Sequence, residues 1–104
     1  LTSTKQPRQV TNAAYIKELD SGVTYLLKVI PPAKGSQRAA FLKQLNTEVR
    51  ELTRIINQLE SGKQTPDSTK LVDACDAVML KIVQSQLTDE DRMSMPDYKY
   101  VKAD

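Results

Sequence analysis

The chain has 104 residues, of which 39% are hydrophobic and 27% charged, and its net charge is +2. This length favours one compact domain, and the composition excludes an intrinsically disordered chain. The low charge, together with four tyrosines, one phenylalanine and no tryptophan, argues against nucleic-acid binding. Because no apolar run approaches the roughly 18 residues that span a bilayer, we expect a soluble protein.

The first ten residues, LTSTKQPRQV, are polar and contain Pro7, which predicts an extended arm. A first helix should follow, because Thr11 and Asn12 are both good N-caps. Pro31-Pro32 should end it, since proline has no N–H to donate and disfavours a helical conformation in the residue before it. Its apolar positions mostly recur every three or four residues: Ile16, Leu19, Val23, Leu26, Leu27 and Ile30.

A second helix should begin at Ser36, a good N-cap in the loop PPAKGS, and should end at Gly62 in the left-handed conformation. Its apolar positions alternate between spacings of three and four: Leu42, Leu45, Val49, Leu52, Ile56 and Leu59. Such a heptad seam is typical of a helix that packs lengthwise against near-parallel neighbours.

The third helix has the clearest start signal. Thr65 is an N-cap, Pro66 suits the first helical position, and Asp67 places a negative charge in the first turn. We expect this helix to continue to about Leu87. Its apolar positions are Leu71, Val72, Cys75, Val78, Met79, Ile82 and Val83.

The segment from Thr88 to Asp91 is typical of another helix start, which predicts a short fourth helix before Pro96. Short connections make successive helices antiparallel, so the expected fold is an all-α, up-and-down bundle of three long helices and this short one. The expected organisation is an arm at 1–10, a bundle at 11–95 and an extended tail, PDYKYVKAD, at 96–104.

The only cysteine, Cys75, lies in the stretch LVDACDAVMLKIV, between Asp73 and Asp76, which raises the question of a reactive or metal-binding thiol. On a helix with about 100° per residue, Asp73 lies about 160° from Cys75 and Asp76 about 100° away. The two carboxylates therefore do not converge on the sulfur. The residues that share its face are apolar, and we interpret Cys75 as a core residue.

The chain contains no histidine, which removes imidazole bases, histidine-activated nucleophiles and histidine-ligated zinc. The carboxylates Glu48 and Glu51 should face outward on the second helix, and the run from Asp89 to Asp91 should cap the fourth. We therefore expect no enzymatic activity, no cofactor and no metal site.

A partner-binding surface is the favoured function class. Lys43, Arg50 and Arg54 should form a basic stripe opposite the heptad seam, either a docking surface or a solvated outer face. The tail is the other candidate, because tyrosines alternate with lysines in it, and it is either disordered or laid along a partner protein. The residues concerned are Tyr98, Lys99, Tyr100 and Lys102.

Residues 24–87, about two-thirds of the chain, resemble the PsbQ-type extrinsic proteins of photosystem II and their algal relatives. The similar features are an aliphatic helix that leads into Ala33-Lys34, a helix that opens with the step from Leu42 to Leu45, and a lysine-containing loop before Thr65-Pro66. The family usually has a longer, proline-rich N-terminal region and a full helix before the matched part, whereas only residues 1–23 precede it here.

The resemblance implies a non-catalytic four-helix bundle in the chloroplast thylakoid lumen, peripheral to the membrane. It would bind protein subunits of photosystem II and stabilise the oxygen-evolving complex. The alternative is a cytoplasmic helical adaptor, such as the three-helix GAT-type modules of membrane traffic. That alternative requires an exposed apolar groove, to which Leu27, Phe41 and Ile55 could contribute.

Overall fold

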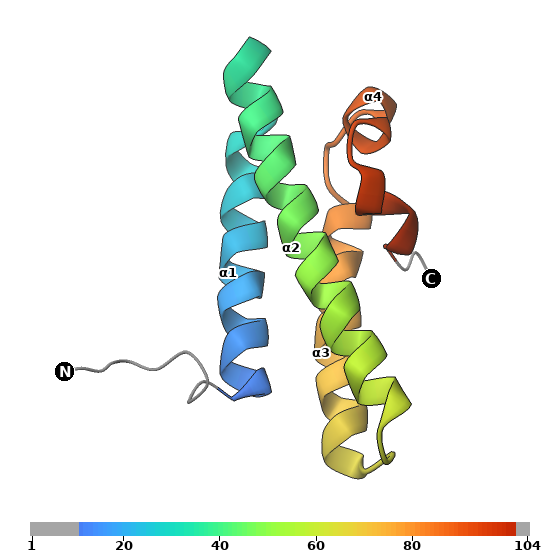
Figure 1. The fold of residues 1–104 in the computed structure, drawn as a ribbon. Coiled ribbons are helices and arrows are strands. Elements are labelled where there is room, and N and C mark those ends of the chain that lie inside the picture. Colours follow the sequence, from blue (N-terminus) through green and yellow to red (C-terminus); the bar gives the residue numbers. More distant parts are fainter. Residues whose placement is uncertain (1–10, 102–104) are drawn as a thin grey trace, which may run out of the picture.

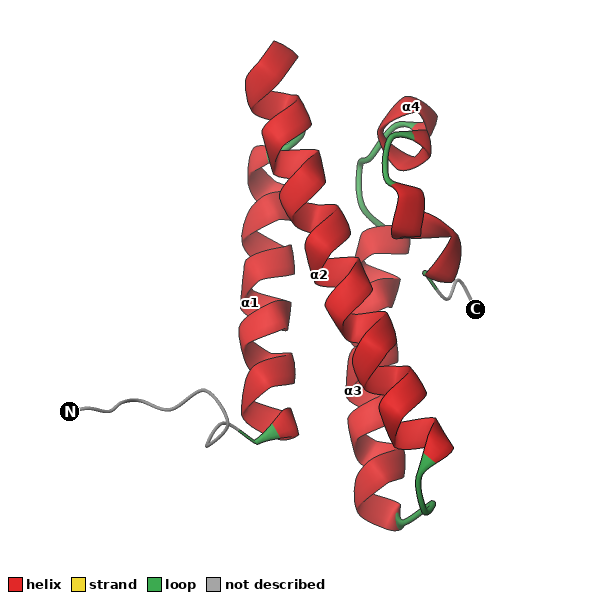
Figure 2. Ribbon diagram, in the orientation of Figure 1, coloured by secondary structure: helices red, strands yellow, loops and turns green. Residues whose placement is uncertain are grey.

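The computed structural model describes residues 11–101, which contain only helices and their connections (Figure 2). The elements are α1 (Asn12–Val29), α2 (Gly35–Ser61), α3 (Pro66–Val83), α4 (Asp89–Met93) and a 3-10 helix, η2 (Pro96–Tyr100). The three long helices pack against one another as an up-and-down bundle (Figure 1). The all-α prediction is confirmed, and the expected N-terminal arm lies outside the described residues.

Three helices begin where their capping residues predict. The Thr11 hydroxyl accepts a hydrogen bond from the backbone N–H of Ala14 and caps α1. Thr65 and Thr88 each form a reciprocal capping box with the residue three positions later, which fixes the starts of α3 and α4. Local side-chain chemistry therefore sets these boundaries.

The boundaries of α2 differ from the prediction. The helix begins at Gly35, one residue before Ser36, and its N-cap Lys34 makes no side-chain capping bond. Gly35 has a φ of +57°, the left-handed region that glycine enters without steric cost. At the other end Gly62 is extended, with a φ of −95°, so the predicted left-handed stop is wrong. The amide of Gln64 donates to carbonyl groups there instead.

Two further elements differ from expectation. Helix α3 ends at Val83 rather than near Leu87, although Leu87 is still buried in the core. Residues 96–100 form η2 instead of an extended tail, and η2 packs against α2. The C-terminal segment, residues 88–101, is therefore part of the folded domain.

Helix α2 is longer than its neighbours, so part of it lies beyond the end of α3. It has 27 residues, whereas α1 and α3 have 18 each. In Figure 1 the N-terminal part of α2 projects past the end of α3, and α4 lies off to one side of it. The surface of α2 that α3 does not reach is therefore bordered by the C-terminal segment.

The core is built from the predicted apolar faces. On α2 the seam residues from Leu42 to Ile56 are buried, and Leu59 packs at its edge. Cys75 is completely buried among apolar side chains, which confirms the core interpretation. Ile55, which lies outside the predicted seam, is also buried at 1% exposure. Helix α2 therefore presents a wider apolar surface than one heptad seam.

The expectation that Glu48 and Glu51 face outward is wrong, because both are half-buried against α1. The Tyr15 hydroxyl donates to Glu51 Oε1 over 2.9 Å. A Cβ on Gly22 would lie 2.8 Å from Glu48 Oε2, so the missing side chain at Gly22 allows the Glu48 carboxylate to approach α1. Glycine inside a helix is less stable than alanine. The presence of Gly22 in α1 is explained by the close packing of Glu48 against it.

Candidate functional site

An open groove of about 870 Å³ runs along the N-terminal half of α2, between that helix and the C-terminal segment. We call it the α2 groove. Its α2 wall consists of two adjacent rows of residues four apart, Gly35, Ala39, Lys43 and Thr47 in the first and Arg38, Leu42, Asn46 and Arg50 in the second. The opposite wall is formed by Glu90, Asp91, Ser94 and Pro96.

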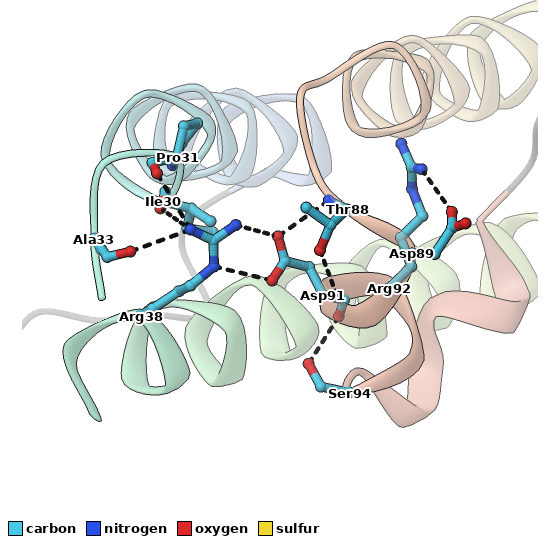
Figure 3. A network of polar contacts seen from close by, with 9 residues as sticks. All are labelled: Ile30, Pro31, Ala33, Arg38, Thr88, Asp89, Asp91, Arg92 and Ser94. Atoms are coloured by element: carbon cyan, nitrogen blue, oxygen red, sulfur yellow. Dashed lines mark hydrogen bonds and ion pairs between the residues drawn. The ribbon is translucent and has the colours of Figure 1, made fainter. Parts of the chain in front are cut away.

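The Arg38 side chain links α2 to the end of α1 and to α4 (Figure 3). Its Nε donates to Asp91 Oδ1 over 3.0 Å, and its Nη2 donates to the other carboxylate oxygen, so the pair is bidentate. Its Nη1 donates to the backbone carbonyls of Ile30, Pro31 and Ala33 at 3.1–3.2 Å. One guanidinium thus satisfies carbonyl groups at the end of α1 and anchors α4.

Asp91 is the buried partner in this network, with 5% of its surface exposed. Besides binding Arg38, its carboxylate accepts the backbone N–H of Thr88, and the Thr88 hydroxyl accepts the N–H of Asp91. The hydrogen bonds from Arg38 are the main reason that the pKa of Asp91 lies below its usual range. The pair therefore stays charged and fixes α4 against α2.

A second polar cluster holds η2. The Asn46 side-chain amide donates to Asp97 Oδ2 over 3.0 Å, and its carbonyl oxygen accepts the backbone N–H of Asp97 over 2.8 Å. Arg50 Nε donates to the same Asp97 oxygen over 3.0 Å. Because Asn46 is buried, this cluster fixes the position of η2 along α2.

The structure divides the predicted basic stripe. Lys43 and Arg50 both line the α2 groove, but Arg50 is paired with Asp97. The Lys43 ammonium makes no hydrogen bond or ion pair to another residue of the described 11–101 range and is exposed to solvent. Arg54 lies apart from the groove and pairs with Glu51, whose pKa is lowered mainly by that contact.

The predicted tail residues do not form a free segment. Tyr98 packs against the core, and the Arg92 guanidinium lies 5.9 Å from the centre of its ring. Lys99 and Tyr100 are exposed, with the Lys99 ammonium 5.3 Å from the Tyr100 ring centre. Lys102 lies outside the described residues.

Three residues that hold the walls of the groove, Arg38, Asn46 and Asp97, are not among the site residues predicted from the sequence. Arg38 could have been found, because it lies one turn before Leu42 in line with the apolar seam. A charged residue continuing an apolar row predicts a partner from another element. Asn46 is recognisable only once η2 is known to pack on α2.

Outside the α2 groove, the side chains of the described residues provide no reactive thiolate and no metal site. Burial raises the pKa of the Cys75 thiol to about 11, so the reactive thiolate is disfavoured at neutral pH. Within residues 11–101, no three histidine, cysteine or acidic side chains are arranged to hold a metal ion. Helices in the same range are all too short or too polar to cross a membrane.

Comparisons of the chain with protein-family models, with curated proteins and with solved structures find no match. Of the three residues expected to contribute to the apolar groove of the GAT-type alternative, Ile55 is in the core, and Leu27 and Phe41 are partly buried against it.

Proposed function

We propose that this protein is a non-catalytic docking subunit that binds a partner protein through the α2 groove. The observation that carries the proposal is the Lys43 ammonium, which is exposed and without a described partner in a groove whose two walls are fixed to each other by polar contacts. A fixed groove loses little conformational entropy on binding, and an unpaired cation gives it electrostatic selectivity.

The resemblance to PsbQ-type proteins makes the proposal more specific. The partner would then be photosystem II on its lumenal side, with the protein peripheral to the thylakoid membrane and stabilising the oxygen-evolving complex. The up-and-down bundle of α1, α2 and α3 supports this proposal, although residues 12–23, which precede the matched part, are the first turns of α1 and form no separate helix like the one that the family usually has there.

Salt-dependent attachment to membranes tests the proposal. The protein is bound to thylakoid membranes whose lumenal side is exposed, and release is measured as salt is increased. We expect release at high salt, because salt screens exposed charges. The variant Lys43→Glu should be released at lower salt than the wild type. A matched control, Lys63→Glu, makes the same charge change at an exposed site beyond the C-terminal end of α2.

Release only by detergent would contradict docking through charge. Equal release of the Lys43→Glu and Lys63→Glu variants would show that the α2 groove is not the contact. Changes in the amide spectrum on titration with ubiquitin would favour the cytoplasmic adaptor.

A further inference from the structure

The α2 wall of the groove has the surface relief onto which another helix packs. Residues four apart on a helix form ridges, and a second helix places its own ridge in the furrow between two of them. The two rows described above are adjacent ridges of this kind. The first begins with Gly35 and Ala39, whose small size leaves room for a close approach. From Gly35 to Arg50 the rows extend about 22 Å, or roughly four turns of helix.

The length of α2 explains why the first of these rows is open. The first row is exposed along its length, whereas the second row is partly covered, because Leu42 and Asn46 are buried and Asn46 binds Asp97 of η2. Within the bundle, the 18 residues of α3 cannot cover all 27 residues of α2, and the five residues of α4 are too few to cover the first row. A fourth long helix of a bundle would occupy such a position. The chain in the described range supplies none there.

The charges of the two walls differ in sign and specify the occupant. On the α2 side Lys43 is unpaired and Arg50 is largely exposed, whereas on the α4 side Glu90 is exposed. A phosphodiester chain or an anionic membrane presents negative charge to both walls and is opposed by Glu90. A helix can carry carboxylates along one edge and ammonium groups along the other.

We propose that the α2 groove binds an amphipathic helix of a partner protein, with acidic residues toward Lys43 and basic residues toward Glu90. This inference rests on the proposed docking function and names the chemistry of the partner segment. The bound helix completes a four-helix arrangement around α2.

Titration of the full chain with synthetic helical peptides tests the inference. Three alanine-based peptides of about 15 residues are compared, matching the length of the rows. The first carries glutamates along one edge and lysines along the other, the second glutamates along both edges, and the third lysines along both. Amide shifts are followed by NMR at Ala39, Lys43, Thr47 and Ser94, which line the groove.

We expect the mixed peptide to bind most tightly, with shifts confined to the groove. Lys43→Glu should weaken its binding about fivefold and should make the all-lysine peptide the preferred one. Glu90→Gln should selectively improve binding of the all-glutamate peptide. Lys63→Glu, the control with the same charge change, should leave the order unchanged.

Equal binding of the three peptides, shifts outside the groove, or stronger binding to anionic lipid vesicles than to any peptide would overturn the inference. Failure of the peptides to bind while Lys43→Glu still promotes release from membranes would overturn the helical occupant alone and leave the docking function standing. If the peptides bind in the expected order but Lys43→Glu does not change release from membranes, docking to the membrane through the groove is contradicted. The helical occupant of the groove would then still stand.

Discussion

The three-helix bundle and the C-terminal segment are held by different forces. In the bundle, α1, α2 and α3 meet through aliphatic side chains, and Leu45, Val49 and Leu52 on α2 have no exposed surface. The C-terminal segment contributes the buried Met95 to the core, but its orientation on α2 depends on Asp91 and Asp97. These two carboxylates bind Arg38, Asn46 and Arg50.

This difference between apolar packing in the bundle and carboxylate contacts in the C-terminal segment shows how one short chain can have both a stable core and a surface for binding. Apolar burial is non-directional and sets the overall packing, whereas the carboxylate contacts are directional and set the geometry of the groove. Substitutions in the two regions should therefore have separable consequences, in stability for the bundle and in local structure for the C-terminal segment.

The largest effect should follow Leu52→Ala, at a fully buried position of α2. Loss of this side chain removes apolar contacts and leaves a cavity, so the free energy of unfolding should fall by about 2–5 kcal/mol. Chemical denaturation monitored by circular dichroism measures it. Leu80→Ala, at a partly exposed position of α3, is the control and should change stability far less. Similar losses in both variants would contradict the assignment of the core.

Asp91→Asn should have the next largest effect, because it keeps the shape of the side chain and removes the charge that Arg38 binds. The free energy of unfolding should fall by about 1–3 kcal/mol. Amides of α4 and η2 should lose protection from hydrogen exchange before those of α1. A uniform loss of protection over the whole domain would contradict the separation of the two regions.

The same pair predicts an acid dependence. The pKa of Asp91 is lower in the folded protein than in the unfolded chain, where it is about 3.9. Its contribution to stability is therefore complete above that value and is lost as the pH falls through the lowered folded pKa. Unfolding measured between neutral pH and about pH 2 should show a weaker dependence on pH in Asp91→Asn than in the wild type.

Cys75→Ala should reduce stability by about 1–2 kcal/mol, as expected for a small truncation in the core. Binding to the partner should be unchanged, because Cys75 lies away from the α2 groove lining. In the wild type, the thiol should react with a thiol reagent only on unfolding. Loss of binding in a fully folded variant would overturn the structural role of this residue.

The smallest effect is expected from Glu48→Gln, which should stabilise the protein. Burial, and then the charge of Glu51, raise the pKa of Glu48, so its ionised form opposes folding. Stability from this group is present at low pH and is lost as the pH rises through the raised pKa. The gain at neutral pH should be about 0.2–0.5 kcal/mol and should vanish in acid. A loss of stability at neutral pH would contradict this account.

The predictable parts of the fold are those encoded by neighbouring residues. Thr11, Thr65 and Thr88 predict where their helices begin, because each capping contact lies within three positions of the N-cap. The heptad seam likewise identified most of the core of α2. Ser36 was misleading, since Gly35 can begin the helix in a conformation that other residues rarely adopt.

The candidate site was only partly predictable, because its geometry depends on distant contacts. Lys43 and Arg50 were identified as surface charges, but no local pattern reveals that Asp97 binds Arg50 or that Asn46 fixes η2. The heptad seam taken as the whole contact surface of α2 predicts an outer face for Glu48 and Glu51. Their true surroundings follow from a second contact with α1, made close by Gly22.

The separation in sequence between the two halves of the groove has a kinetic consequence. Arg38 and Asp91 are 53 positions apart, and Asn46 and Asp97 are 51 apart. Contacts that close such long loops are entropically costly to form early, so the helical hairpins should assemble first during folding and the C-terminal segment should dock last. The wall that carries Glu90 should then also be the first part to open when the domain unfolds, while the three long helices are still packed together.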